Sequence, residues 1–101
     1  MGVRGVVNSS AHTQPAASTS TATALAENHA RRSALFVNDS DTVIYLRIDG
    51  ASAVVNQGIR LNALGGMWEM SEQLGNLNRG VVNMIAASGS SKVLLVTEGV
   101  K

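Results

Sequence analysis

The chain has 101 residues, 45% of them hydrophobic, and eight lysines and arginines balance seven aspartates and glutamates. This length suits one domain, and the balanced charge provides neither the basic stripe of a nucleic-acid-binding protein nor a run of like charge suited to a membrane surface. Cysteine is absent, which excludes disulfides and thiolate metal sites, and no apolar run approaches the roughly 18 residues of a membrane-spanning helix.

Residues 1–30 differ in composition from the rest and are expected to form an extended N-terminal arm. Residues 8–23 are mainly Ser, Thr, Ala and Gln, and they include no Asp, Glu, Lys or Arg. Such a segment buries too little apolar surface to order itself, so it is either a flexible arm or an extended strand laid on another surface. Alternation over residues 18–25 predicts a strand in the second half of the arm, while Val3, Val6 and Val7 give its beginning an apolar character.

Residues 31–101 are expected to form a β-sandwich domain. Strands are predicted at 33–38, 42–48, 58–61, 66–70, 81–87 and 92–97, with the spacing of about 8–12 residues that is typical of a sandwich or barrel. Ile44, Leu46 and Ile48 share one face of the second of these strands and are expected to face the core. The polar link at 88–91 predicts an antiparallel hairpin between the last two strands, and residues 71–80 are expected to form a loop.

The stretch GIRLNALGGMWEM at 58–70 has a double glycine between two short apolar runs. We interpret Gly65 and Gly66 as a corner of the sandwich, because glycine allows the backbone to turn tightly. Trp68 then shares a strand face with Met70 and is interpreted as an anchor in the core or in a subunit contact. Stacking of Trp68 on a sugar or a base is the alternative.

Candidate catalytic groups do not form a recognisable pattern. His12 and His29 lie in the expected arm without metal ligands at useful spacing. Asp39 and Asp41 lie on a polar turn, where calcium binding would need several more oxygen ligands. The glycines form no phosphate-binding motif, and no serine has the surroundings of a catalytic nucleophile. We therefore expect no catalytic residue, no metal and no cofactor, and we expect that the protein is not an enzyme.

An ordered series of short motifs covers roughly residues 30–99. The series is ARRS at 30–33, LFVN at 35–38, SD at 40–41, IY at 44–45, GIRL at 58–61, GG at 65–66 before an aromatic residue and Glu69, VNMIAASG at 82–89, and a closing strand at 93–99. This order resembles small structural proteins encoded among the virion genes of tailed bacteriophages. The resemblance implies a compact all-β protein, a small antiparallel β-sandwich or barrel that is jelly-roll-like.

The resemblance also implies a capsid cement or decoration protein that binds between major capsid subunits, as a homo-oligomer or in many symmetric copies. It would be located in the virion, on the capsid surface, after assembly in the host cytoplasm, without nucleic acid or membrane as a partner. A head–tail adaptor or tail component, and a carbohydrate-binding module for host attachment, are the alternatives. The expected interface residues are Val3, Arg4, Val6, Val7, Arg31, Arg32 and Trp68.

Overall fold

The computed structural model describes residues 9–101, and within this range the regular elements are β-strands without any helix. The strands are β1 (Ser9–Thr13), β2 (Ala16–Ala17), β3 (Ala22–Leu25), β4 (Arg31–Asn38), β5 (Ile44–Arg47), β6 (Ile59–Leu61), β7 (Met67–Ser71), β8 (Val82–Ala86) and β9 (Lys92–Val100). The predicted all-β class is confirmed. No helix in the described part of the chain is long and apolar enough to cross a membrane.

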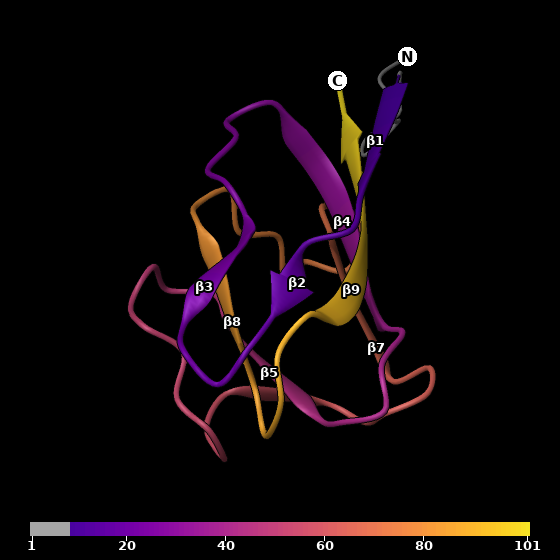
Figure 1. Ribbon diagram of the computed structural model, residues 1–101. Helices are drawn as coiled ribbons and strands as arrows, with labels where there is room; N and C mark the ends of the chain where they lie inside the picture. Colours follow the sequence, from indigo (N-terminus) through magenta and orange to yellow (C-terminus); the bar gives the residue numbers. More distant parts are fainter. Residues whose placement is uncertain (1–8) are drawn as a thin grey trace.

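The strands form two antiparallel sheets (Figure 1). The first sheet has the order β1-β9-β4-β7, and β2 pairs with β9 beyond the end of β1. The second sheet has the order β3-β8-β5-β6. The hydrophobic residues that the two sheets bury between them form one core, as expected of a β-sandwich.

β1 and β2 are two halves of one edge strand. Thr13 pairs with Val96, and Ala16, three residues later, pairs with Val93, three residues earlier in β9. The register with β9 is therefore the same for β1 and β2. Pro15 lies at the interruption. With β1 and β2 taken together, eight strands fill two four-stranded sheets, and the chain changes sheet at every connection except that from β5 to β6. This is the strand order of a jelly roll, which winds two Greek keys into two packed sheets.

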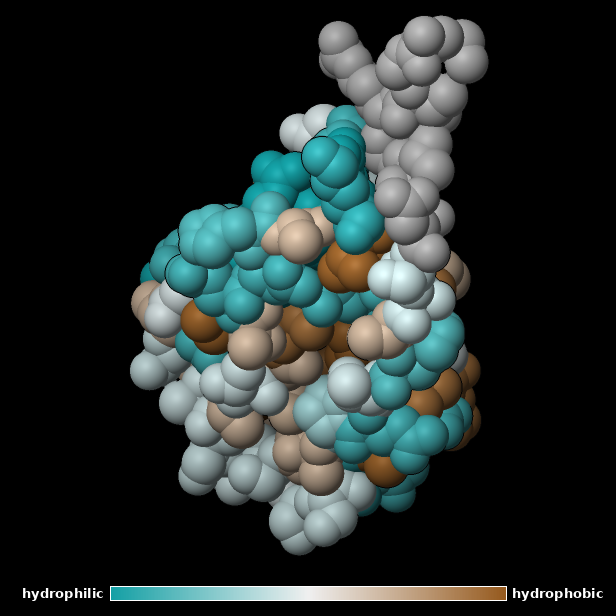
Figure 2. Space-filling view, turned by 90° about the horizontal axis from the view of Figure 1, so that it is seen from above, coloured by the Kyte–Doolittle hydropathy of each residue, from teal (hydrophilic) through white to brown (hydrophobic). Residues whose placement is uncertain are grey.

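The core lies between the sheets and is built mainly from aliphatic side chains. Its buried members are Ala17, Ala24, Ala34, Phe36, Ile44, Leu46, Leu61, Met70, Val82, Met84, Ala86, Leu94 and Val96. Ile44 and Leu46 are fully buried and Ile48 packs partly against them, so the predicted core face of β5 is confirmed. Figure 2 looks onto the end of the molecule that carries the chain's C-terminus, where hydrophobic side chains are visible between hydrophilic ones.

The opposite face of β5 is covered by a loop. Tyr45 packs with Ile85 and Ala53, and its hydroxyl donates to Asn56 Oδ1 at 2.8 Å. The loop at 48–58 therefore folds over the outer face of the second sheet. A residue on the side of the strand away from the core is buried as a consequence.

The double glycine is a corner between the sheets, because β6 belongs to the second sheet and β7 to the first. Gly65 has φ +114°, and a Cβ on Gly66 would lie 2.3 Å from the backbone nitrogen of Asn62. Side chains other than hydrogen do not fit at Gly66 without a backbone shift. The predicted corner is confirmed, with a physical reason for the second glycine.

The hairpin predicted at 88–91 is wrong. β8 pairs with β3 and β5, whereas β9 pairs with β1, β2 and β4 in the other sheet. The polar link is therefore an arch from one sheet to the other. A turn signal in the sequence indicates that the chain reverses, but it does not state which sheet the next strand joins.

Residues 9–25, which the sequence analysis assigned to the arm, form β1, β2 and β3 within the two sheets. Ala17 and Ala24 are buried in the core, and β1 and β2 pair with β9 while β3 pairs with β8. Backbone pairing with strands of the sandwich orders this segment despite its low hydrophobicity. Low apolar content did not predict this order, because ladder hydrogen bonds form between backbone groups and not between apolar side chains.

Candidate functional site

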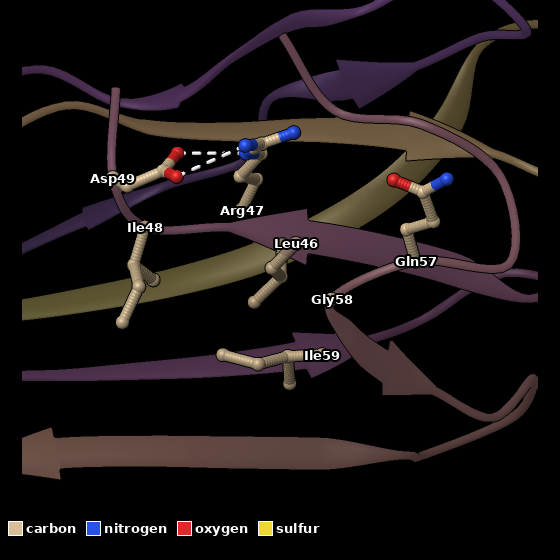
Figure 3. A pocket seen from close by; sticks show the side chains of 7 residues that line it. All are labelled: Leu46, Arg47, Ile48, Asp49, Gln57, Gly58 and Ile59. Atoms are coloured by element: carbon tan, nitrogen blue, oxygen red, sulfur yellow. Dashed lines mark hydrogen bonds and ion pairs between the residues drawn. The ribbon is translucent and has the colours of Figure 1, made fainter. Parts of the chain in front are cut away.

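An open groove of about 390 Å³ lies where β5 meets β6 (Figure 3). Its lining comes from the end of β5, the following residues and the start of β6: Leu46, Arg47, Ile48, Asp49, Gln57, Gly58 and Ile59. Figure 3 shows the three aliphatic side chains on one side of β5, with Arg47 and Asp49 on the other. The groove therefore has an apolar floor and a polar rim.

The narrow approach of two backbones shapes the groove. Leu46 pairs with Ile59 across the antiparallel β5–β6 ladder. Gly58 precedes this pair with φ +87°, and a Cβ there would lie 2.4 Å from the backbone oxygen of Leu46. Glycine is required on both grounds, since a side chain would be strained at this φ and would collide with the neighbouring strand.

The charges at the rim neutralise one another. Arg47 Nε donates to Asp49 Oδ1 at 2.7 Å, and Arg47 Nη2 donates to Oδ2 at 3.0 Å. The hydrogen bond from Arg47 lowers the pKa of Asp49, and the same bond raises the pKa of Arg47. Both groups stay charged at neutral pH, so neither exchanges protons readily there. The groove is therefore suited to holding an apolar group by burial. Its titratable lining residues, Arg47 and Asp49, both have pKa values shifted away from neutrality.

Arg31 was expected at an interface, and the structure instead places its side chain fully inside the fold. Its Nε donates to Glu98 Oε2 at 2.7 Å, Nη1 donates to the carbonyls of Asn78 at 2.6 Å and Gly80 at 3.0 Å, and Nη2 donates to the carbonyl of Ala26 at 2.5 Å. Glu98 also accepts from Asn28 Nδ2 at 3.2 Å. Arg31 thus joins β4 to β9 and fastens two loops. The side chain therefore has an internal role, in place of the expected position at an interface.

Arg32 points to a different group, although it is the neighbour of Arg31. Its Nη1 donates to both carboxylate oxygens of Glu72, at 3.0 and 2.8 Å, and Arg79 Nη2 reaches the same carboxylate at 2.8 Å. The Arg32 side chain is 23% exposed. Two cations therefore share one carboxylate at the surface, beside the loop that follows β7. No local pattern in the sequence indicates this cluster, because Arg32 precedes Glu72 by 40 residues.

Trp68 lies on β7 opposite Phe36 of β4. The two rings stack with centroids 6.0 Å apart and an interplanar angle of 28°, and Trp68 packs against the core. This agrees with the interpretation of Trp68 as a core anchor. Arg31, Arg32 and Trp68 do not converge on one surface. The other expected interface residues, Val3, Arg4, Val6 and Val7, lie outside the described residues.

Three of the four candidate metal ligands, Asp41, His12 and His29, are engaged with other groups. Asp41 accepts from Lys92 Nζ at 2.7 Å, and this hydrogen bond lowers the pKa of Asp41. His12 Nδ1 lies 3.1 Å from Thr97 Oγ1, and His29 Nε2 lies 3.1 Å from Glu27. Over residues 9–101, no three His, Asp or Glu side chains gather closely enough to hold a metal ion.

Comparisons with protein-family models, with curated proteins and with solved structures find no match. The resemblance to phage virion proteins remains a prediction from the sequence motifs.

Proposed function

We propose that this protein is a non-enzymatic structural protein of a tailed-phage virion, and specifically a cement or decoration protein that binds between major capsid subunits. The observation that carries the proposal is the strand order β1-β9-β4-β7 packed on β3-β8-β5-β6. Double-sheet jelly rolls of eight strands recur in viral capsid and lectin domains. The motif order in the sequence points to the same class.

The polar groups support a mechanical role. Arg31 is bonded to Glu98, Arg47 to Asp49, and Lys92 to Asp41, each at 2.7 Å. Arrangements of this kind fasten strands and loops, whereas a catalytic centre usually holds a titratable group whose pKa is tuned toward neutrality. The pKa values of Asp41 and Asp49 are instead lowered, which moves them further from neutrality.

The proposed mechanism is attachment of many symmetric copies to the capsid surface, after assembly in the host cytoplasm. Val3, Val6 and Val7 supply apolar contacts to neighbouring capsid subunits, and Arg4 supplies a cation for an acidic group there. No cofactor, nucleic acid or membrane takes part. The sandwich itself is the stable body from which these contacts extend.

Copy number in purified virions tests the proposal. Quantitative mass spectrometry is expected to give on the order of hundreds of copies per particle, as repeated binding over a symmetric shell requires. A count of about six or twelve would replace the cement role with that of a head–tail adaptor or tail ring, since closed rings have such symmetries. Absence of the protein from purified particles would refute the virion proposal altogether.

Sugar binding is the second candidate, since lectin domains share the jelly-roll architecture. The position of Trp68 argues against it, because this ring stacks on Phe36 and packs against the core. Trp68 is the sole tryptophan, so its fluorescence reports on this site directly. We expect no change in emission on titration with host glycans, and a saturable change would favour the carbohydrate-binding module.

A further inference from the structure

β1 forms an outer edge of the first sheet (Figure 1) and is the most accessible strand of the described chain. It has five residues, and each of them is exposed. Exposure of successive residues means that both faces of the strand are open, because side chains alternate between faces. Within the described residues β1 pairs only with β9, so one edge and both faces are accessible.

The register of the β1–β9 ladder shows which backbone groups face outward. The amide of Leu94 donates to the carbonyl of Pro15 at 3.0 Å, which makes these two residues a hydrogen-bonded pair. In an antiparallel ladder, such pairs recur at every second residue. Thr13, Ala11 and Ser9 therefore turn their backbone groups toward β9. Ser10 and His12 turn their N–H and C=O groups toward the open edge.

The other sheet edges carry protective features that β1 lacks. The β3–β8 ladder has a register shift between Thr23 and Leu25. β6 has only three residues and includes the exposed Arg60, and β7 includes the exposed Glu69. Bulges, short lengths and charges are the usual means by which edge strands avoid pairing with other chains. β1, with the sequence SSAHT, contains no charged carboxylate, lysine or arginine and no proline.

We propose that β1 is a self-association edge, at which β1 of a second copy adds antiparallel with its centre at Ala11. Ser10 then lies opposite His12 of the second copy, and the outward N–H and C=O groups of these residues bond across the new ladder. Ser9 lies opposite Thr13, a hydroxyl pair of the kind that stabilises sheets, and Ala11 lies opposite Ala11. The strand matches its own reverse in charge and chemistry, as a two-fold interface requires.

The size of the contact sets its strength. Five residues span about 17 Å of strand. A contact of this length buries less surface area than the roughly 1,000 Å² of a stable interface. The dimer is therefore expected to be weak and reversible, visible at high protein concentration or where copies are crowded together. Self-association through β1 does not depend on the proposed capsid role, so either can fail without the other.

A cysteine scan of the full chain tests the register, since the protein has no native cysteine. Ala11 would face its own copy in a non-hydrogen-bonded pair, in which the Cα atoms are about 4.5 Å apart, within the range of a disulfide. Ala11→Cys is expected to form disulfide-linked dimers under mild oxidation several-fold faster than Thr13→Cys, whose thiol faces Ser9. Equal rates for the two variants would overturn the proposed pairing.

A proline substitution tests the backbone bonding. Ser10→Pro removes an N–H that points away from β9, so the β1–β9 ladder keeps its hydrogen bonds, and prolines are tolerated at such edge positions. Sedimentation equilibrium is expected to show a concentration-dependent dimer for the wild type and for Ser10→Ala, and a monomer for Ser10→Pro with an unchanged circular dichroism spectrum. Association of Ser10→Pro at wild-type strength, or a wild type that stays monomeric throughout, would refute the proposal.

Discussion

The strongest test of the fold concerns Arg31 and Glu98, whose side-chain nitrogen and oxygen lie 2.7 Å apart. Arg47 and Asp49 have the same separation of 2.7 Å at the surface. The two pairs differ in burial, because the Arg31 side chain is 0% exposed and that of Arg47 is 37% exposed. Arg31→Met and Arg47→Met therefore compare one interaction in two environments.

The expected loss for Arg31→Met follows from what remains behind. The carboxylate of Glu98 and the carbonyls of Asn78, Gly80 and Ala26 would all lose a hydrogen-bond donor. Removing one partner of a buried ion pair costs about 3–5 kcal/mol. A domain of this size has a total stability of about 5–15 kcal/mol, so the variant loses about a fifth of it or more. Arg47→Met is expected to change stability little, since exposed pairs are solvated in either state.

Urea unfolding, followed by Trp68 fluorescence, measures both variants. The double variant Arg31→Met/Glu98→Leu serves as a control, because it removes the carboxylate that the single change leaves unpaired. We expect it to be more stable than the sum of the two single losses predicts. If Arg31→Met lowers the free energy of unfolding no more than Arg47→Met does, burial does not strengthen the contribution of the Arg31–Glu98 pair to stability.

Three further predictions concern a glycine, a buried amide and an acidic side chain. Gly58→Ala is expected to lower the unfolding free energy more than Gly50→Ala does. Both positions have positive φ, where a side chain costs about 1–2 kcal/mol of strain, but of the two only the Cβ at position 58 would also collide with a backbone oxygen. Equal losses of stability in urea would contradict this expectation. Asn38→Ala is expected to lower the free energy of unfolding by about 1–3 kcal/mol, measured by thermal or urea unfolding. The fully buried side-chain amide of Asn38 makes hydrogen bonds to four backbone and side-chain groups near the turn that follows β4. An unchanged stability would show that water replaces the amide. Asp49→Asn is expected to lower the urea midpoint only slightly near neutral pH, since its ion pair with Arg47 is exposed, and to match the wild type in strong acid. The pKa of Asp49 is lowered in the folded state by Arg47, so its contribution is present above its ordinary value of 3.8 and is lost as the pH falls through the folded pKa. A difference that grows toward acid would have the wrong sign.

Patterns along the chain were sufficient to predict most of the sandwich. Strands with alternating aliphatic residues, such as β5 with Ile44 and Leu46, were predicted with their core face, because burial on one side imposes a period of two. The corner at Gly65 and Gly66 was also predicted from glycine alone. Composition misled for β1 and β2, whose order comes from ladder bonds to β9 and not from their own side chains.

The sites were harder to predict than the strands. Arg31 was expected at an interface, but arginine is buried only with a partner, and its partner Glu98 lies 67 residues further along the chain. The groove combines residues of β5 with the start of β6, and its width depends on the close approach at Gly58. Pairings between distant segments of this kind are absent from any local window of the sequence.

The place of β9 has a consequence for how the protein forms. β9 comes from the end of the chain and lies between the edge strand formed by β1 and β2 on one side and β4 on the other, with Ser9 paired to Val100. The first sheet is therefore incomplete until β9 has been synthesised. Pairing of β9 with β1 then closes a long loop between Ser9 and Val100, and such closures slow folding. Folding is expected to be slow and to be completed only after β9 has been synthesised, and until then β4 exposes the edge that β9 covers in the folded protein.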